Sequence, residues 1–383
     1  MEEENAQFRK SSIIKGVMKL APNLQSLENA LEAKDEAELR DQFANAYYLH
    51  QPPQVSLKIQ AFIKGGLRVT DAYRKVALAQ MEEEEKEAFA QVAFGYGLDQ
   101  FNELNPVDIT NLPYYKLLMS LEEKRFGKIR FFTRRYAPYE VFLSKEQYYD
   151  EGLGTSVLPL GYYKEGLSFP AVEKKGRVWM SLIPHEIETM KEPIAKAKGS
   201  VLVLGIGLGY YAYEVSNKED VTRVTLVEND PEVIAFFKDA LLPHFPHKEK
   251  IEIIEGDGIA YMASKQSQYD FAFVDIYHNE EDGLPLYLRL LSKQAIPTTY
   301  WIESSLLLYF RRYLIAFLQE QYEGYTAADY QNEDGFDNSL FAHLYRLTKQ
   351  ISIESEEDLE NFLSADNVAI LAMDIAKAMY HKN

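Results

Sequence analysis

Three glycines spaced two residues apart follow directly on an apolar run, residues 201–204: they are Gly205, Gly207 and Gly209. Such a run is typical of a strand buried in a parallel sheet, and glycine lets the backbone of the following turn approach a ligand closely. Glu228 follows about twenty residues later, at the end of the next apolar run. A glycine turn with a carboxylate at that spacing is how a doubly wound sheet binds an adenosine-type cofactor.

Further acidic residues follow the third and fourth apolar runs in the same way. Asp257 with Gly258 comes after the third run, and Asp275 comes directly after the fourth. The carboxyl ends of parallel strands line one crevice, so we expect these acids to meet there. In that crevice Glu228 can accept hydrogen bonds from both hydroxyls of a ribose, and Asp257 can accept one from an adenine amino group.

Two rings just beyond Asp275 could also take part in chemistry. Tyr277 and His278 are candidates for a general base or for a clamp on the acceptor. Packing of both rings against the crevice wall is an equally good alternative. Tyr210 stands where a nicotinamide-binding turn would have its third glycine, and the chain has no Walker-type phosphate loop. The pattern therefore favours an adenosine-type cofactor other than a dinucleotide.

The elements that must position these residues alternate between strand and helix. Strand-like runs cover residues 201–204, 222–227, 251–254, 269–274 and 299–303, with helical segments such as 231–242 between them. This alternation predicts an α/β fold with a Rossmann-like parallel sheet. We expect four parts: a helical module in 1–125, a β-hairpin segment in 126–183, the Rossmann-like domain in 184–304 and a helical extension in 305–383.

Composition narrows the classes of function. The chain has 383 residues, no cysteine and a formal net charge of −18, so thiolate chemistry is excluded and nucleic acid is disfavoured as a partner. We read the basic residues between Lys124 and Arg135 as a solvated strand face. No apolar run is long enough for a membrane span, and the acidic start of the chain is unlike a secretory signal, so a cytoplasmic protein is predicted. His244 and His247 are not expected to bind metal, and a homo-oligomer is left open.

The segment from about residue 200 to 291 resembles the class I S-adenosylmethionine-dependent methyltransferases, close to the branch of the spermidine synthases. The quoted glycines and acids match that family's motifs in order. The resemblance implies S-adenosyl-L-methionine as cofactor and assigns a place to each motif residue. Gly205, Gly207 and Gly209 would lie beneath the methionine portion, with Glu228 at the ribose, Asn229 beside the adenine, Asp257 at the adenine amine, and Asp275 at the sulfonium facing the acceptor.

Features of the spermidine synthase branch are present only in part. That branch has a His-Glu pair ahead of the glycine turn, as His185-Glu186 stands here. It also has two acids in an Asp-Ser/Thr-x-Asp-Pro sequence after the fourth strand. In this chain His278 replaces the second acid, which weakens the case for a diamine acceptor. The antiparallel strand pair that usually closes the family's sheet is not recognisable after residues 299–303.

Three hypotheses remain. The leading one is a methyltransferase acting on a small molecule or a protein side chain. The second is an aminopropyltransferase that uses decarboxylated S-adenosylmethionine. The third is a scaffold that binds the cofactor without turnover. Asp275, Tyr277 and His278 are the expected catalytic residues.

Overall fold

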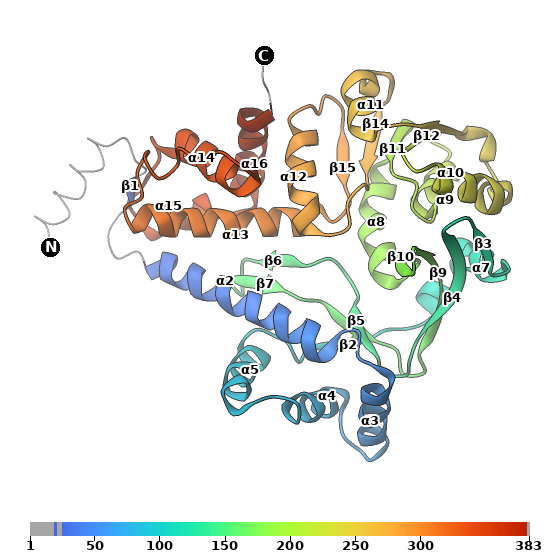
Figure 1. Ribbon diagram of the computed structural model, residues 1–383, viewed down its shortest axis with the longest axis horizontal. Helices are drawn as coiled ribbons and strands as arrows, with labels where there is room; N and C mark the ends of the chain where they lie inside the picture. Colours follow the sequence, from blue (N-terminus) through green and yellow to red (C-terminus); the bar gives the residue numbers. More distant parts are fainter. Residues whose placement is uncertain (1–18, 21–24, 381–383) are drawn as a thin grey trace, which may run out of the picture.

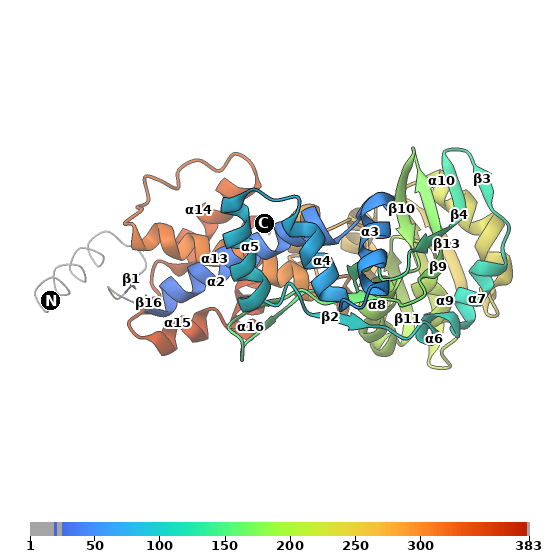
Figure 2. The same ribbon diagram turned by 90° about the horizontal axis from the view of Figure 1, so that it is seen from below.

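The computed structural model describes residues 19–20 and 25–380. Parts of the predicted helical module, residues 1–18 and 21–24, lie outside the described residues. The molecule is elongated, with the central sheet at one end and the C-terminal helices at the other (Figures 1 and 2). None of the described helices combines the length and the apolar character that crossing a membrane would require.

A five-stranded parallel sheet forms the centre of the fold, in the order β13-β12-β11-β14-β15. Its strands are β11 (Gly199–Leu204), β12 (Val221–Glu228), β13 (Ile251–Glu255), β14 (Phe271–Val274) and β15 (Thr298–Tyr300). The apolar run 201–204 is at most 2% exposed because β11 is central and covered on both faces. The predicted α/β fold with a Rossmann-like sheet is confirmed.

Helices cover both faces of this sheet. They are α8 (Pro184–Lys196), α9 (Tyr210–Ser216), α10 (Pro231–Phe236), α11 (Gly258–Lys265) and α12 (Glu280–Leu291). The strand order proceeds in one direction from β11 to β13 and in the other from β14 to β15. Because parallel crossovers are right-handed, α9 and α12 lie on opposite faces. α8 packs beside α9 and therefore lies on the face opposite α12.

The N-terminal segment consists mainly of short helices. These are α2 (Gln25–Phe43), α3 (Pro53–Lys64), α4 (Val69–Leu78), α5 (Glu83–Gly95), α6 (Val107–Thr110) and α7 (Pro113–Ser120), with a π-helical turn at Ala44–Tyr48 after α2. Pro53 at the start of α3 and a capping box between Glu82 and Glu85 at α5 explain where two of them begin. Edge-to-face rings of Tyr48, Tyr73 and Phe89 form the centre of a separate core.

Small β-sheets connect these helices to the central sheet. An antiparallel sheet has the order β10-β9-β4-β3, and the ring of Phe131 on β4 lies 6.1 Å from that of Phe236 on α10. The bounds of these strands are β2 (Phe101–Glu103), β3 (Lys124–Phe126), β4 (Ile129–Tyr136), β5 (Val141–Leu143), β6 (Tyr148–Asp150), β7 (Thr155–Val157), β8 (Leu160–Tyr162), β9 (Leu167–Lys174) and β10 (Arg177–Ser181). Whether the segments form separate domains stays a prediction.

The C-terminal segment occupies the edge of the central sheet. It contains α13 (Glu303–Tyr322), α14 (Phe336–Thr348), α15 (Glu356–Phe362) and α16 (Ala365–Tyr380), and a short strand β16 (Ser352–Ile353) pairs with β1 (Lys19–Leu20). Within the described part of the chain, β15 is the last strand of the sheet. The predicted strand 299–303 is shorter than expected, because the backbone turns at Ile302 (φ 47°, ψ 40°) and α13 begins at Glu303.

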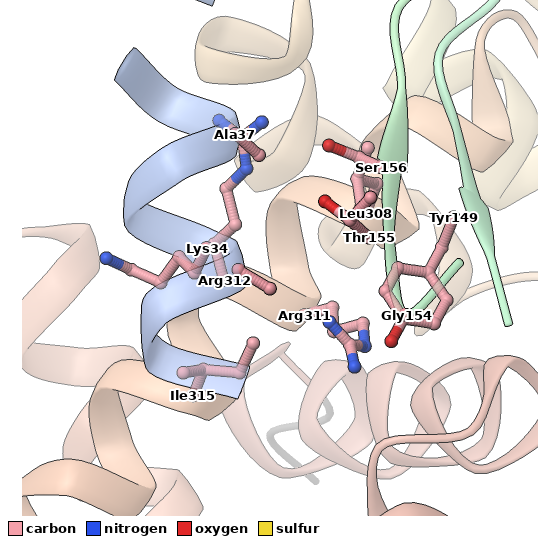
Figure 3. Close-up of a pocket in the computed structure, with 11 residues that line it drawn as sticks. Lys34, Ala37, Tyr149, Gly154, Thr155, Ser156, Leu308, Arg311, Arg312 and Ile315 are labelled. Atoms are coloured by element: carbon pink, nitrogen blue, oxygen red, sulfur yellow. The ribbon is translucent and has the colours of Figure 1, made fainter. Parts of the chain in front are cut away.

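α13 also joins the two ends of the chain. It runs alongside α2 and the β6–β7 hairpin (Figures 1 and 2). Two arginine side chains lie in this junction. Arg311 lies over the ring of Tyr149 at 3.7 Å (Figure 3), and Arg312 pairs with Asp41 at 3.0 Å. We call this region the arginine junction.

Candidate active site

The three glycines of the turn after β11 have different surroundings. A Cβ on Gly205 would lie 2.0 Å from the carbonyl oxygen of Asp275, and one on Gly209 would lie 2.9 Å from the hydroxyl of Tyr114. These two glycines are therefore needed for close packing of the chain itself. A Cβ on Gly207 would have only the sulfur of Met180 nearby, at 3.6 Å. Gly207 is thus the least crowded of the three glycines.

Glu228 lies at the carboxyl end of β12 and is connected to this turn. Its Oε1 accepts from the backbone N–H groups of Asn229 and Asp230, both at 2.9 Å, and its Oε2 accepts from that of Ile206 at 3.3 Å. These bonds hold the carboxylate against the glycine turn. Oε2 accepts only one of these bonds and keeps acceptor capacity, so the group can receive a ribose hydroxyl.

Asp257 lies at the end of the neighbouring strand, β13. Its Oδ1 caps α11 by accepting from Ala260 N at 2.8 Å, and Gly258 is the first residue of that helix. Asp257 and Asn229 are both exposed. The fold therefore brings the residues expected at the ribose and adenine to adjacent strand ends, as parallel pairing of β12 with β13 requires.

Asp275 ends β14 and is coupled electrostatically to Glu186. Burial, and secondarily the charge of Glu228, raises the pKa of Asp275 to about 7. Burial, and secondarily the charge of Asp275, raises the pKa of Glu186 to about 8. Asp275 therefore ionises first, and its charge then keeps the proton on Glu186. Two coupled carboxyl groups titrating near neutral pH can accept and hold protons during a reaction.

Glu186 was not among the predicted site residues. It stands in the first turn of α8, ahead of the sheet, and only the folded chain brings it to Asp275. In the sequence, Glu186 is indicated only by the His-Glu pair, which resembles that of the spermidine synthase branch. Its neighbour His185 has its pKa lowered to about 4 by burial and packs edge-on against Trp301, with the ring centroids 6.1 Å apart.

The two rings after Asp275, those of Tyr277 and His278, lie in different surroundings. Tyr277 is 5% exposed, and its hydroxyl donates to the backbone carbonyl of Trp301. That placement matches the packing alternative for this ring. His278 is exposed, and its Nδ1 lies 3.1 Å from Oδ2 of Asp282 in the first turn of α12. The catalytic role predicted for both residues stays a prediction.

The class of domain follows from this geometry: a Rossmann-like fold whose glycine turn and carboxylates line the carboxyl edge of the sheet. Residues 185–293 match the family model described as the spermine/spermidine synthase domain. A polyamine aminopropyltransferase of Bacillus cereus is 36% identical over 78 residues, which is 20% of this chain and 28% of the relative. One of Desulforudis audaxviator is 38% identical over the same share of each chain.

The match is confined to part of each protein: the chain spans 28% of the length of these curated relatives. A crystal structure of spermidine synthase from Thermotoga maritima is also similar, at 17% sequence identity and a TM-score of 0.28, over 38% of this chain and 58% of that one. The fold assignment therefore rests on the strand order of the sheet itself. The expectation of an enzyme is confirmed at the level of the matched domain.

The leading hypothesis of a methyltransferase is wrong. The family model and the curated relatives agree on the aminopropyl-transferring branch, which is the second hypothesis. The matched segment contains both the His-Glu pair and His278, so the replacement of one acid by His278 does not argue against this branch.

Proposed function

We propose that this protein is an aminopropyltransferase, which transfers the aminopropyl group of decarboxylated S-adenosylmethionine to a small amine. The observation that carries the proposal is the family match over residues 185–293, because it contains both Glu186 and Asp275. A small-molecule acceptor replaces the broader expectation of a small molecule or a protein. Cytoplasmic location and oligomeric state stay predictions.

The chemistry requires few protein groups. The acceptor nitrogen attacks the propyl carbon next to the sulfonium, the carbon–sulfur bond breaks, and its electron pair stays on the sulfur of methylthioadenosine. The attacking nitrogen must be free of one proton beforehand and loses another afterwards. Asp275, with a pKa of about 7, is suited to accept that proton at neutral pH. The remaining catalytic effect would come from alignment of nitrogen, carbon and sulfur.

The charge of the crevice supports the decarboxylated donor. Glu228 and ionised Asp275 make it negative, and the charged groups that shift the pKa of Asp275 are Glu228 and His278. The aminopropyl arm of the decarboxylated donor carries a positive charge alone. The parent cofactor adds a carboxylate, which like charges in a half-buried site would repel.

Calorimetric titration with both donors tests this proposal. We expect decarboxylated S-adenosylmethionine to bind at least about tenfold more tightly than the parent, the ratio that a difference of about 1.4 kcal/mol produces. In the Asp275→Asn variant this preference should narrow, because the negative charge of ionised Asp275 is removed. A clear preference of the native protein for the parent cofactor would refute the proposal.

A further inference from the structure

A cavity of about 240 Å³ lies beside the edge of the central sheet that β15 forms. Its walls come from three parts of the chain: α8, the segment from β15 into α13, and the loop between β5 and β6. Three carboxylates and one lysine line it, namely Glu146, Glu192, Glu303 and Lys196. Two of these carboxylates, Glu146 and Glu303, come from outside the segment that matches the family model.

An unpartnered hydroxyl faces this cavity. Thr299 is 8% exposed, and its Oγ1 has no hydrogen-bond partner among the described residues. The next residue, Tyr300, packs its ring on Tyr287 of α12 at 4.8 Å. Because side chains alternate along a strand, Thr299 points to the opposite face, which α8 covers. Thr189 and Pro193 of α8 line the same cavity, so the hydroxyl is directed into it.

The carboxylates of the cavity have partners within the protein. Oε1 of Glu146 accepts from Ser305 N at 2.7 Å in the first turn of α13, and Oε1 of Glu303 accepts from the hydroxyl of Tyr287 at 3.1 Å. Glu192 pairs with Lys196 at the exposed rim, at 2.6 Å. The backbone N–H groups of Ser304 and Ser305 favour the ionised form of Glu146, and that of Tyr300 favours the ionised form of Glu303. These bonds at the start of α13 leave the cavity itself and the partnerless hydroxyl of Thr299 unexplained.

We propose that this cavity binds the ammonium group of a small alkyl amine, with Glu146, Glu303 and the hydroxyl of Thr299 as its acceptors. An ammonium has three donors and a positive charge, which match two carboxylates and a hydroxyl. Burial raises the pKa of Glu146 to about 7 and raises that of Glu303. Burial thus disfavours the charged forms of both carboxylates, and a bound cation would offset this by favouring their ionised forms.

Trp301 connects the cavity to the candidate active site. Its indole N–H donates to Thr189 on the cavity wall at 3.0 Å, and its carbonyl accepts from Tyr277, two residues after Asp275. The amine could therefore be the far end of the acceptor or a separate molecule. Binding of an ammonium stands without the proposed function. Only the identification of this amine as the acceptor rests on it.

Calorimetry with 1,4-diaminobutane tests the binding, with uncharged 1,4-butanediol as the matched control ligand. We expect the diamine to bind and the diol not to bind. Glu146→Gln and Glu303→Gln should each weaken binding by about tenfold or more, as loss of a charged hydrogen bond does. Glu323→Gln, exposed at the far end of α13, should leave binding unchanged. No binding of the diamine, or equal binding by the native protein and both cavity variants, would overturn the proposal.

The Thr299→Val variant separates an effect on ligand binding from an effect on folding. The variant removes a hydroxyl that has no partner, so thermal stability should be unchanged or higher. Binding of the diamine should nevertheless weaken, by about threefold to tenfold. Weaker binding with full stability supports a ligand site, whereas unchanged binding removes Thr299 from it and contradicts the proposal.

Steady-state kinetics distinguishes the two sources of the amine. If the cavity holds the far end of the acceptor, Glu303→Gln raises the KM for diamine with little change in kcat. If it holds a separate molecule, the variant loses calorimetric binding while KM stays the same. If the protein has no aminopropyl transfer activity at all, the proposed function fails, and the calorimetry still decides the inference.

Discussion

The arginine junction and the candidate active site both contain buried charges, but they differ in compensation. Arg40 is fully buried, and its guanidinium donates to Asp41 and to Ser156. Asp41 in turn pairs with Arg312 of α13. In the active site neither Glu186 nor Asp275 has a cation that offsets its burial, and the pKa of each is raised. The paired charges of the junction stabilise the fold. Acids without a cationic partner lower its stability, and such groups are typical of active sites.

The locations of the two regions support this contrast. The arginine junction connects α2, the β6–β7 hairpin and α13, which are far apart in sequence (Figure 3). The coupled acids lie within the segment that matches the spermine/spermidine synthase domain. Substitutions in the junction should therefore change stability, and substitutions in the crevice should change turnover.

The largest effect is expected for Asp275→Asn. Removal of the proton acceptor should lower kcat by about a thousandfold, within the usual range for a general base. Release of methylthioadenosine from decarboxylated S-adenosylmethionine measures this rate. Binding of methylthioadenosine should stay the same. Activity within tenfold of the native protein would show that Asp275 is not the base.

Arg40→Met should have the largest effect on stability. It leaves the carbonyl and hydroxyl of Ser156 without their donor and opens a buried ion pair, so we expect a loss of about 3 kcal/mol. Urea denaturation measures the loss, and kcat per folded molecule should be unchanged. Arg68→Met, in an exposed pair with Asp71, is the control and should leave stability the same. Equal stability of the two variants would contradict a structural role for the junction.

Glu228→Ala should weaken binding of the donor. Loss of the ribose acceptor is expected to raise Kd by about tenfold to a hundredfold, measured by calorimetry with methylthioadenosine. Glu219→Ala, exposed before β12, is the matched control. An unchanged Kd in the Glu228 variant would remove this residue from the nucleoside site.

The smallest effect is a pH dependence of stability. Folding raises the pKa of Asp275 from 3.8 to about 7 and that of Glu186 from 4.5 to about 8. Their contribution to the free energy of unfolding is therefore fully present below the lower values and is lost as pH rises from these to the higher ones. We expect the free energy of unfolding to fall across that window by about 1 kcal/mol, since both side chains are only half-buried. Asp275→Asn should flatten this fall. An equally steep fall in the variant would show that other titratable groups cause the pH dependence.

Local sequence patterns predict the sheet well. The apolar runs of β11, β12 and β14 and the turn at Gly205 follow from burial on both faces and from backbone freedom. The end of the sheet was predicted less accurately, because residues 299–303 are apolar enough to continue a strand. Ile302, the residue before α13, has a left-handed backbone conformation that the pattern of apolar residues does not indicate.

Long-range contacts limit how much of the site can be predicted from the sequence. Glu228, Asp257 and Asp275 each follow a strand, so strand order alone places them together. Glu186 precedes the sheet on a helix, and Glu146 reaches α13 from a loop more than a hundred residues away. Neither contact has a period or a spacing that a sequence pattern could show.

The most direct test of the central claim is the mass of the product formed from a diamine. The purified protein is incubated with 1,4-diaminobutane and an equimolar mixture of decarboxylated and parent S-adenosylmethionine. We predict a diamine heavier by one aminopropyl group, together with methylthioadenosine. A methylated amine together with S-adenosylhomocysteine would contradict the account.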